Sequence, residues 1–562
     1  MEVETDTGVT EEHKLRRLLF TATSSSSLRL QGGYKKKSGC HYDLNQASIG
    51  GINKNEINQL TSLLQPPPGM GAGFTNLALQ HCLAAIQTNI ADRRALFLVL
   101  SAILKTDCKQ TKTQVYQAIS KLISTPEDLF EFFYYHRKIF DRKPWGMGSG
   151  MRRMLKNWYL SQDPYDLALD VSRVVSRHNW THADIIKLAR PVARDAALDV
   201  VLFSLVHHWR KVQHKYEGNR EAQPVLEYLA CVREINTCVS PERAVQLIER
   251  HSFDMECVPT HLRGHLPVFE AALVRMPLRG VLTQLRVMTS LNFLTAENNP
   301  ILVKLQTILE DPVALRASQL EPAEILGVLV QAECGWALPA QSRPQGPEIP
   351  HREKEKKRVP NQKPHISVIQ SLKSMLNSSL PLVSKAPMSM VVCVDTRNSL
   401  QDCCYGAWTL SISRALSTLL LSLLHAETDL RLVYMTPEVT PVPLNKSETV
   451  EAVQTRLEAL PQNNSMDPVA VLRWVRASLG SVDLVVVATH SRDQLADSAG
   501  LGAAMEQFRQ DGSNLKFVYW ALHSKKLESG KIAGEDNPNI LHLSGWCPDA
   551  KRIMQAFGLN YF

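Results

Sequence analysis

Three cations at helical spacing are the residues of this sequence best suited to bind a polyanion. Arg152 and Lys156 are four residues apart and share one face of a helix, with Arg153 beside them. Phosphates attract such cations, and Trp158-Tyr159, which follow directly, offer aromatic faces on which unpaired bases stack. The alternative is a basic outer helix face whose aromatic side chains point into the core. The residues alone leave both interpretations open.

A histidine lies in the first turn of another predicted helix. In Asn179–Asp184, Thr181 has the position of an N-cap, Asp184 completes a capping box three residues later, and an apolar helix follows. His182 therefore lies where free N–H groups and the helix dipole favour a phosphate. A structural role for His182 is nevertheless the interpretation that the residues alone favour.

The segment Asp395-Thr-Arg-Asn-Ser399 follows a predicted buried strand, the position of the D-x-S-x-S loops that hold a divalent ion. Arg397 takes the place of the first serine of that pattern. A guanidinium cannot ligate a metal, and its charge repels one. No phosphate-binding loop, nucleophile elbow or H-E-x-x-H motif is present, which points away from catalysis. A hydrolase in this region would have only its fold as support.

The elements that position these residues fall into two classes. Between Thr75 and Leu338 one amphipathic helix follows another, with Thr125 and Ser240 as N-caps before proline and acids. Successive helices without strands predict a HEAT-like solenoid or ring. After residues 339–365, rich in proline and charge, β-rich runs alternate with helical segments. This alternation predicts a doubly wound parallel α/β sheet. The predicted strands are 390–395, 430–435, 484–489 and 515–522, and the predicted helices are 408–425, 447–460 and 468–479.

Composition excludes several classes of protein. With 562 residues, 44% of them hydrophobic and 21% charged, the chain is expected to fold into more than one globular unit. The acidic N-terminus lacks an apolar stretch and no apolar run reaches membrane length, so we expect neither a signal peptide nor a membrane span. Eleven cysteines without a C-x-x-C pair argue against a disulfide framework and a zinc site, and favour a reducing compartment.

The net charge of the chain is concentrated in one window. Residues 136–215 contain fifteen Lys or Arg against seven Asp or Glu, a net charge of +8 that equals the excess of the whole chain. A local basic field of this size favours polyanions as partners. The alternative is a solvated helical surface whose acids lie elsewhere in the sequence but close in space.

Three runs together resemble the Ro ribonucleoprotein family, which joins a ring of helical repeats, the TROVE domain, to a von Willebrand factor A (vWA)-like domain. They are Gly148–Tyr159, Arg177–Pro191, and Met276-Pro-Leu278 with the residues up to Thr289. The resemblance extends from about Leu15 to the end of the chain. It implies a disordered tail (1–14), a TROVE ring (15–338), a linker (339–366) and a vWA-like α/β domain (367–562).

The resemblance also implies an RNA site. The family binds small noncoding Y RNAs on the outer ring surface, and misfolded RNAs whose single-stranded ends thread the hole. His182 matches a histidine important for RNA binding, whereas Ser149 replaces an arginine common in the family. The predicted RNA-binding residues are His182, Arg152, Arg153, Lys156, Trp180, Lys187 and Arg190.

The family's metal site is altered. Asp395 and Ser399 match it, and Ser465 replaces a threonine conservatively, but Arg397 stands for a serine and His490 for an aspartate. We therefore expect divalent (Mg²⁺) binding to be weak or lost, with Arg397 paired to Asp395 in place of the metal.

We accordingly predict a nonenzymatic RNA-binding protein, a ribonucleoprotein component in RNA quality control, whose α/β domain closes the ring or recruits protein partners. We expect it in the cytoplasm. The basic run Lys354–Arg358 is favoured as a solvated linker, with nuclear import as the alternative. The rival hypothesis is a protein-interaction scaffold of Ro architecture that has lost its RNA and metal sites.

Overall fold

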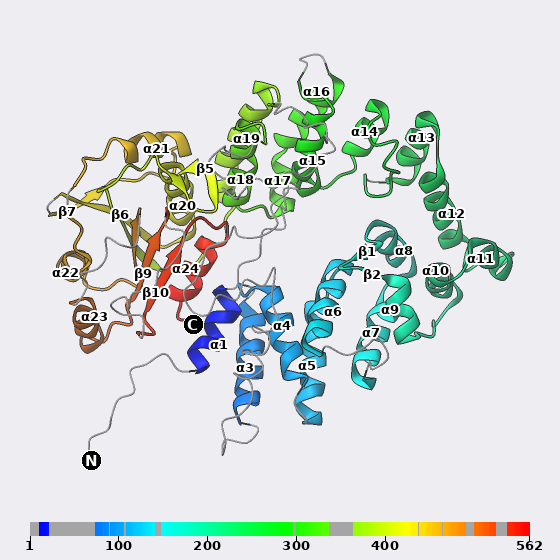
Figure 1. Ribbon diagram of the computed structural model, residues 1–562, viewed down its shortest axis with the longest axis horizontal. Helices are drawn as coiled ribbons and strands as arrows, with labels where there is room; N and C mark the ends of the chain where they lie inside the picture. The colour runs from blue at the N-terminus through cyan, green and yellow to red at the C-terminus, as the bar shows by residue number, and fades with distance from the viewer. Residues whose placement is uncertain are drawn as a thin grey trace, which may run out of the picture. The chain divides into compact units, whose positions relative to one another are not determined.

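Two compact units make up the part of the chain that the structure describes. The computed structural model describes residues 11–21, 73–88, 90–105, 108–140, 148–253, 255–295, 299–336, 363–436, 438–463, 465–490, 500–523 and 537–562. Contacts group helices α3 to α14 into one unit, the helical unit, and α1 with everything from α15 onward into another, the α/β unit (Figure 1). The predicted linker up to residue 362, its basic run, and the first ten residues of the predicted tail lie outside the described residues.

The helical unit consists of short amphipathic helices that pack against near neighbours in the chain, as α4 packs on α6 and α7 on α9. The predicted start signals are confirmed: the hydroxyl of Thr125 accepts a hydrogen bond from the amide of Asp128, and that of Ser240 from the amide of Arg243. No helix in the described residues is both long and apolar enough to span a membrane. The helices are α3 (Gly73–Thr88), α4 (Arg93–Ile103), α5 (Lys109–Leu122), α6 (Pro126–Phe140), α7 (Ser149–Ser161), α8 (Pro164–Arg173), α9 (His182–Ala189), α10 (Ala196–Val206), α11 (Trp209–Tyr216), α12 (Gln223–Thr237), α13 (Pro241–His251) and α14 (Leu266–Leu273).

Four further helices of the predicted array belong to the α/β unit by their contacts. They are α15 (Leu278–Ser290), α16 (Pro300–Leu309), α17 (Pro312–Ser318) and α18 (Pro322–Glu333). Helix α18 packs against α19 (Ile366–Ser379) and against α20 (Ile412–Ala426). The ion pair between Arg414 of α20 and Glu333 of α18 strengthens this packing. The change in sequence character at residues 338–339 therefore does not coincide with the division by contacts.

The α/β unit is built on a six-stranded sheet in the order β10-β9-β8-β3-β6-β7, in which only the β6–β7 pair is antiparallel. Alternate residues of the central strands face opposite layers. Val391 and Val485 pack in a core with α22 (Pro468–Ser478) and α23 (Leu501–Gln510), while α20 and α24 (Ala550–Gly558) lie against β6 and β9. This confirms the predicted doubly wound sheet. The strands are β3 (Ser389–Val394), β6 (Asp429–Thr436), β7 (Glu438–Val442), β8 (Leu484–Thr489), β9 (Lys516–Ala521) and β10 (Ile540–Ser544).

In this unit some predicted helix boundaries are wrong, and some strands of the structure were not predicted. Helix α20 does not begin at Trp408, because Ala407–Ser411 forms β5, which pairs with β4 (Cys403–Cys404). The helix begins after Ser411, whose hydroxyl accepts the amide of Arg414 as a true N-cap. Strands β7 and β10 were not predicted. Helix α21 (Val450–Glu458) is shorter than predicted, because Thr449 caps it.

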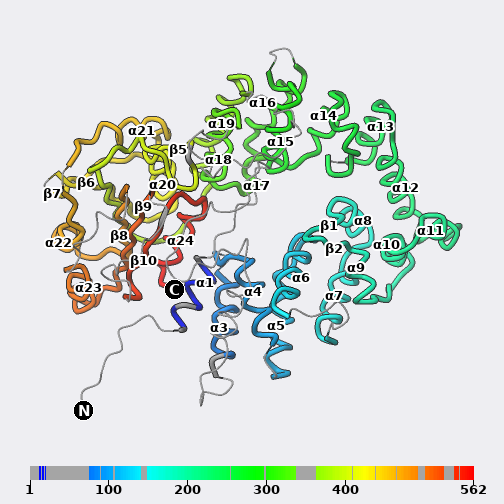
Figure 2. Tube along the Cα trace, in the orientation of Figure 1, coloured from blue at the N-terminus to red at the C-terminus, as the bar shows by residue number. Residues whose placement is uncertain are grey.

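Helix α1 (Glu11–Thr21) packs against α24 and the last residues of the chain, as the tube in Figure 2 shows. Residues 11–14, which were predicted to belong to a disordered tail, form its first turn. Arg16 donates hydrogen bonds to the carbonyls of Asn560 and Tyr561, and the ring of Phe20 stacks 5.7 Å from that of Phe562. Arginine contacts of this kind satisfy carbonyls at the end of α24.

Candidate nucleic-acid interface

The predicted cations of α7 and α9 lie on the outer faces of two helices that pack against each other. On α7 the core side includes Met151, Met154 and Leu155, and the cations lie at positions between these buried residues. Arg152, Arg153, Lys187 and Arg190 are exposed, and Lys156 is half-buried. No side chain of these five cations has an ion pair or hydrogen bond within the described part of the chain. They are referred to below as the α7–α9 cations.

Several other cations of the helical unit are already paired. Their partners lie within 2.6 to 3.3 Å: Arg93 with Asp128, Arg94 with Glu131, Arg194 with Asp195 and Lys215 with Asp199. A polyanion that bound there would have to compete with these carboxylates. The α7–α9 cations require no such exchange, so they form the surface best prepared for phosphates.

His182 is buried between three helices. Only 1% of the residue is exposed, its Nδ1 shares a 2.8 Å hydrogen bond with the hydroxyl of Tyr159 on α7, and its ring lies 4.7 Å from that of Phe130 on α6. Burial lowers the pKa of His182 to about 4, which the nearby backbone of Val174 only partly opposes. The side chain is therefore neutral and does not face solvent. The structural interpretation fits this geometry, and a role in RNA binding stays a prediction.

The capping box that places His182 is present as predicted. The hydroxyl of Thr181 accepts the amide of Asp184 at 3.2 Å, and the Asp184 carboxylate accepts the amide of Thr181 at 3.0 Å. Helix α9 then ends at Arg190 in a left-handed conformation, φ 55°. The start of the predicted helix is thus fixed by its own residues, Thr181 and Asp184.

The aromatic residues after the α7 cations do not face solvent. Trp158 is 6% exposed and Tyr159 is fully buried, so the alternative in which these rings pack into the core is correct. Trp180 is half-buried, with its ring 4.7 Å from that of Phe133 and 5.7 Å from the guanidinium of Arg137. Among the aromatic candidates of the prediction, Trp180 alone retains partial access to solvent.

A small hairpin next to α9 was not predicted. Strands β1 (Ser176–Arg177) and β2 (Trp180–Thr181) pair antiparallel across a two-residue turn, with His178 at φ 53° and Asn179 at φ 65°. Two consecutive positive φ angles are typical of a type I′ turn, which asparagine tolerates well. His178 contacts Glu131 at 2.7 Å and stacks on Tyr134 at 4.3 Å, which fastens the hairpin to α6. Asn179 is the signal in the sequence that could have indicated it.

A second basic surface lies on α11. Arg210 and Lys211 are exposed and have no carboxylate partner in the described residues. Beside them the ring of His207 lies 3.9 Å from that of half-buried Phe203, and the guanidinium of Arg233 lies 5.5 Å from the ring of Trp209. The sequence indicated this region only by the charge of residues 136–215. The turn between α10 and α11 brings its aromatic rings together.

The carboxyl edge of the sheet brings together only part of the predicted metal site. The Asp395 side chain is 1% exposed and pairs with Arg397 at 2.7 Å, as predicted. Ser399 is exposed and its hydroxyl accepts the amide of Gln401, while Ser465 is exposed and its carbonyl accepts the side-chain amide of Asn463. No hydrogen bond in the described residues joins Ser465 to Asp395. The guanidinium of Arg397 is paired with the carboxylate of Asp395, so these residues do not fit a divalent ion.

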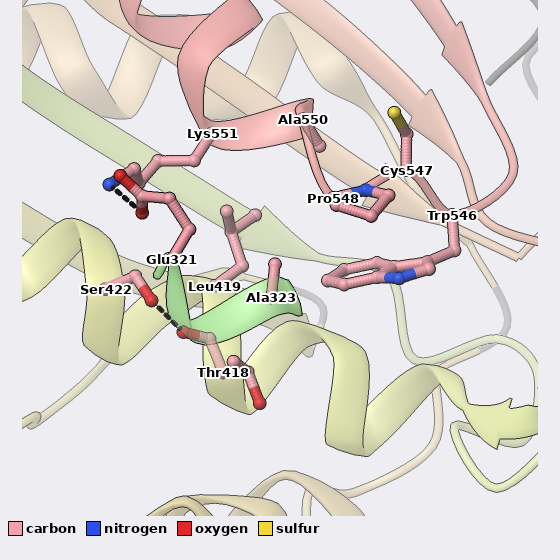
Figure 3. Close-up of a pocket in the computed structure, with 10 residues that line it drawn as sticks. All are labelled: Glu321, Ala323, Thr418, Leu419, Ser422, Trp546, Cys547, Pro548, Ala550 and Lys551. Carbon is pink, nitrogen blue, oxygen red and sulfur yellow. Dashed lines mark hydrogen bonds and ion pairs between the residues drawn. The ribbon is translucent and has the colours of Figure 1, made fainter. Parts of the chain in front are cut away.

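A small pocket of the α/β unit lies between α18, α20 and the start of α24 (Figure 3). Its two charged side chains form an ion pair, in which Lys551 donates to Glu321 at 2.6 Å. The hydroxyl of Ser422 donates to the carbonyl of Thr418. No unpaired polar group in its lining points to a ligand, and the pocket does not extend the candidate interface.

Comparison with known proteins agrees with this architecture. The sequence model of the TROVE domain matches residues 75–326, and that of the Ro60 vWA domain matches residues 389–558. The chain is 23% identical over 464 residues to RNA-binding protein RO60 of Deinococcus radiodurans, a match that covers 82% of this chain and 80% of that protein. RNA-binding protein RO60 of Caenorhabditis elegans is 25% identical over 256 residues, covering 37% and 39% of the two chains.

A solved structure has the same fold. The crystal structure of the RO (RSR) protein of Deinococcus radiodurans superposes with a TM-score of 0.71 at 20% identity, covering 98% of this chain and 100% of that one. The TROVE model matches the helical region and the Ro60 vWA model matches the mostly parallel α/β sheet that follows it, which is the domain order of Ro proteins. The chain belongs to the Ro protein family, with a TROVE domain followed by a Ro60-type vWA domain.

Proposed function

We propose that this protein binds RNA through the α7–α9 cations and acts as the protein component of a ribonucleoprotein. The observation that carries the proposal is the contrast within one unit between these unpartnered cations, four of which are exposed, and neighbouring cations held by carboxylates. The two relatives named above are RNA-binding proteins, which supports RNA as the polyanion. Small noncoding RNAs such as Y RNA, and misfolded RNAs with single-stranded ends, are the proposed partners.

The proposed role is binding and not catalysis, in RNA quality control. The free cysteines of the described residues are compatible with the cytoplasm, which we propose as the location. Within this role His182 would act by position: its buried ring joins α7 to the first turn of α9 and so sets where the cations of both helices lie.

The proposal predicts that unpaired and paired cations differ in their effect on RNA affinity. Replacing Arg153, Lys187 and Arg190 by glutamine should weaken binding of a hairpin RNA with a single-stranded 3′ tail by about tenfold or more, about 1.4 kcal/mol. The matched control replaces Arg93, Arg194 and Lys215, which removes the same charge from paired positions. Fluorescence anisotropy at constant salt measures both.

Equal losses in the two variants would show that only net charge matters and would remove the α7–α9 surface from the proposal. No RNA binding by the unmodified protein would favour the rival function, an interaction scaffold of Ro architecture.

A further inference from the structure

The loop that follows β3, residues 395–405, is referred to below as the edge loop. Its first residue, Asp395, is buried, and both of its carboxylate oxygens are fully engaged. Oδ1 accepts the backbone amide of Arg397 at 3.1 Å and its Nε at 3.0 Å, while Oδ2 accepts Arg397 Nη2 at 2.7 Å and the hydroxyl of Thr489 at 2.7 Å. A carboxylate with four such donors has its charge and its lone pairs satisfied.

The rest of the edge loop is fastened to the ends of the neighbouring strands. His490, directly after β8, contacts Asp402 at 2.9 Å. His523, two residues after β9, bonds through Nδ1 to the carbonyl of Cys403 at 2.7 Å, and its ring stacks 4.4 Å from that of His490. The amide of Tyr405 donates to the carbonyl of Leu522 at 2.8 Å. Hydrogen bonds between protein groups therefore hold the edge loop to the neighbouring strands at several points.

A divalent ion has no coordination set here. The guanidinium would have to leave Asp395, and Thr489, whose hydroxyl donates to the same carboxylate, is itself only 1% exposed. Thr396 Oγ1 is buried without a hydrogen-bond partner in the described residues, but this hydroxyl alone cannot hold a divalent ion while the guanidinium occupies Asp395. Like charge adds to this exclusion, because a cation is already present.

We propose that Arg397 is a permanent internal cation at this edge, and that it holds the edge loop in one conformation that does not depend on a divalent metal. Removal of the guanidinium leaves Asp395 as a buried carboxylate without a counter-ion, and so creates a site that takes a divalent ion. The inference concerns the α/β unit and does not rest on RNA binding.

The first test uses the unmodified full chain with Mn²⁺ as the probe. Electron paramagnetic resonance should detect no bound ion tighter than about 1 mM, the weak end of protein sites for divalent ions. Thermal unfolding should be unchanged between EDTA and excess Mg²⁺. In the described part of the chain no group of three or more His, Cys, Asp or Glu is arranged to hold a metal, so background binding should be low. One ion bound well below 1 mM, or an unfolding temperature raised by Mg²⁺, would overturn the proposal.

The second test creates the site. Arg397→Ser should bind one Mn²⁺ per chain about tenfold tighter or more than the unmodified protein. The chain offers a matched control in Arg431→Ser, because Arg431 pairs with Asp429 at the same spacing and at 3.0 Å, but on an exposed part of β6. The control should gain no ion.

If Arg397→Ser does not fold, Arg397→Gln fills more of the space and carries the same expectation. Arg397→Lys, which keeps the positive charge, should stay without an ion. Variants that fold and bind Mn²⁺ no better than Arg431→Ser would show that the guanidinium is not what excludes the metal, and would also overturn the proposal.

Discussion

At the scale of single residues, Glu427 is the carboxyl group whose charge state matters most for the α/β unit. It follows α20 and is 6% exposed, with Oε1 accepting Gln555 Nε2 at 2.6 Å and Oε2 buried without a partner in the described residues. Burial raises the pKa of Glu427 to about 7, against the opposing effects of Gln555 and Lys551. A proton on Oε2 is therefore stable in the folded protein near neutral pH.

The raised pKa predicts that stability falls as the pH rises. The folded state holds the proton up to about pH 7, whereas the unfolded chain releases it near 4.5, so the stabilisation is complete below pH 4.5 and is lost through pH 7. Glu427→Gln keeps the shape and cannot ionise. Between pH 5 and pH 8 the unmodified protein should lose about 3 kcal/mol relative to this variant.

Chemical denaturation at the two pH values measures the difference. Glu438→Gln, at an exposed carboxylate on β7, is the control and should behave like the unmodified protein. A stability difference between Glu427→Gln and the unmodified protein that is constant with pH would contradict the assignment.

Local pairs could be predicted from the sequence, and distant ones could not. The Asp395–Arg397 pair was predicted because its partners are two positions apart and the loop follows a recognisable strand. The environment of Glu427 was not, because its partner Gln555 is 128 residues away. A structural role for His182 was favoured from the residues alone, yet nothing in the sequence identified Tyr159 as its hydrogen-bond partner.

At the scale of elements, the hydrogen bond between Tyr159 and His182 connects α7 to α9. Tyr159→Phe keeps the buried ring and removes a bond worth about 1 kcal/mol, so the first turn of α9 loses its attachment. If His182 acts by positioning, this variant should weaken RNA affinity severalfold and speed hydrogen exchange in α9. A direct contact of His182 with RNA would instead leave affinity unchanged.

The control for this prediction is Tyr216→Phe. Tyr216 is also buried and also loses one hydrogen bond, to Asp199, but it ties α11 to α10 and not α7 to α9. Equal effects of the two variants on RNA binding would indicate general destabilisation of the helical unit.

Elements were predicted best where a local signal defines their ends. Helix α22, predicted at 468–479, begins after the N-cap Asp467 and is followed by Gly480 at φ 76°. The segment Ala407–Ser411 was mistaken for helix because its apolar residues continue the pattern of α20, while its pairing with β4 is a tertiary contact. Strands β7 and β10 are short edge strands, whose pairing partners rather than their own residues define them.

At the scale of the whole molecule, charge is distributed unevenly along the chain. Residues 136–215 carry the full net charge of +8, so the remaining residues sum to zero. RNA binding through phosphate contacts releases counter-ions from RNA. The five α7–α9 cations should give a slope of log affinity against log salt of about −3.5 to −4.5.

Neutralising Arg153, Lys187 and Arg190 should make that slope shallower by about 2 to 3. RNA titrations at salt concentrations between about 50 and 200 mM measure this slope, because counter-ion release changes affinity strongly over that range. A slope that is flat in the unmodified protein would exclude phosphate contacts as the main source of affinity.

The packing of α1 has a consequence for how the protein is made. Arg16 contacts Tyr561, a separation of 545 residues, so helix α1 finds its partner only when Tyr561 has been synthesised. At roughly 5 to 20 residues per second, a ribosome needs about half a minute to two minutes to cover that distance. Throughout that time the apolar side of α1, including Phe20, has no native surface to cover it. Chaperone occupancy during translation is therefore expected to begin at this helix and to persist until the segment around Tyr561 has been synthesised.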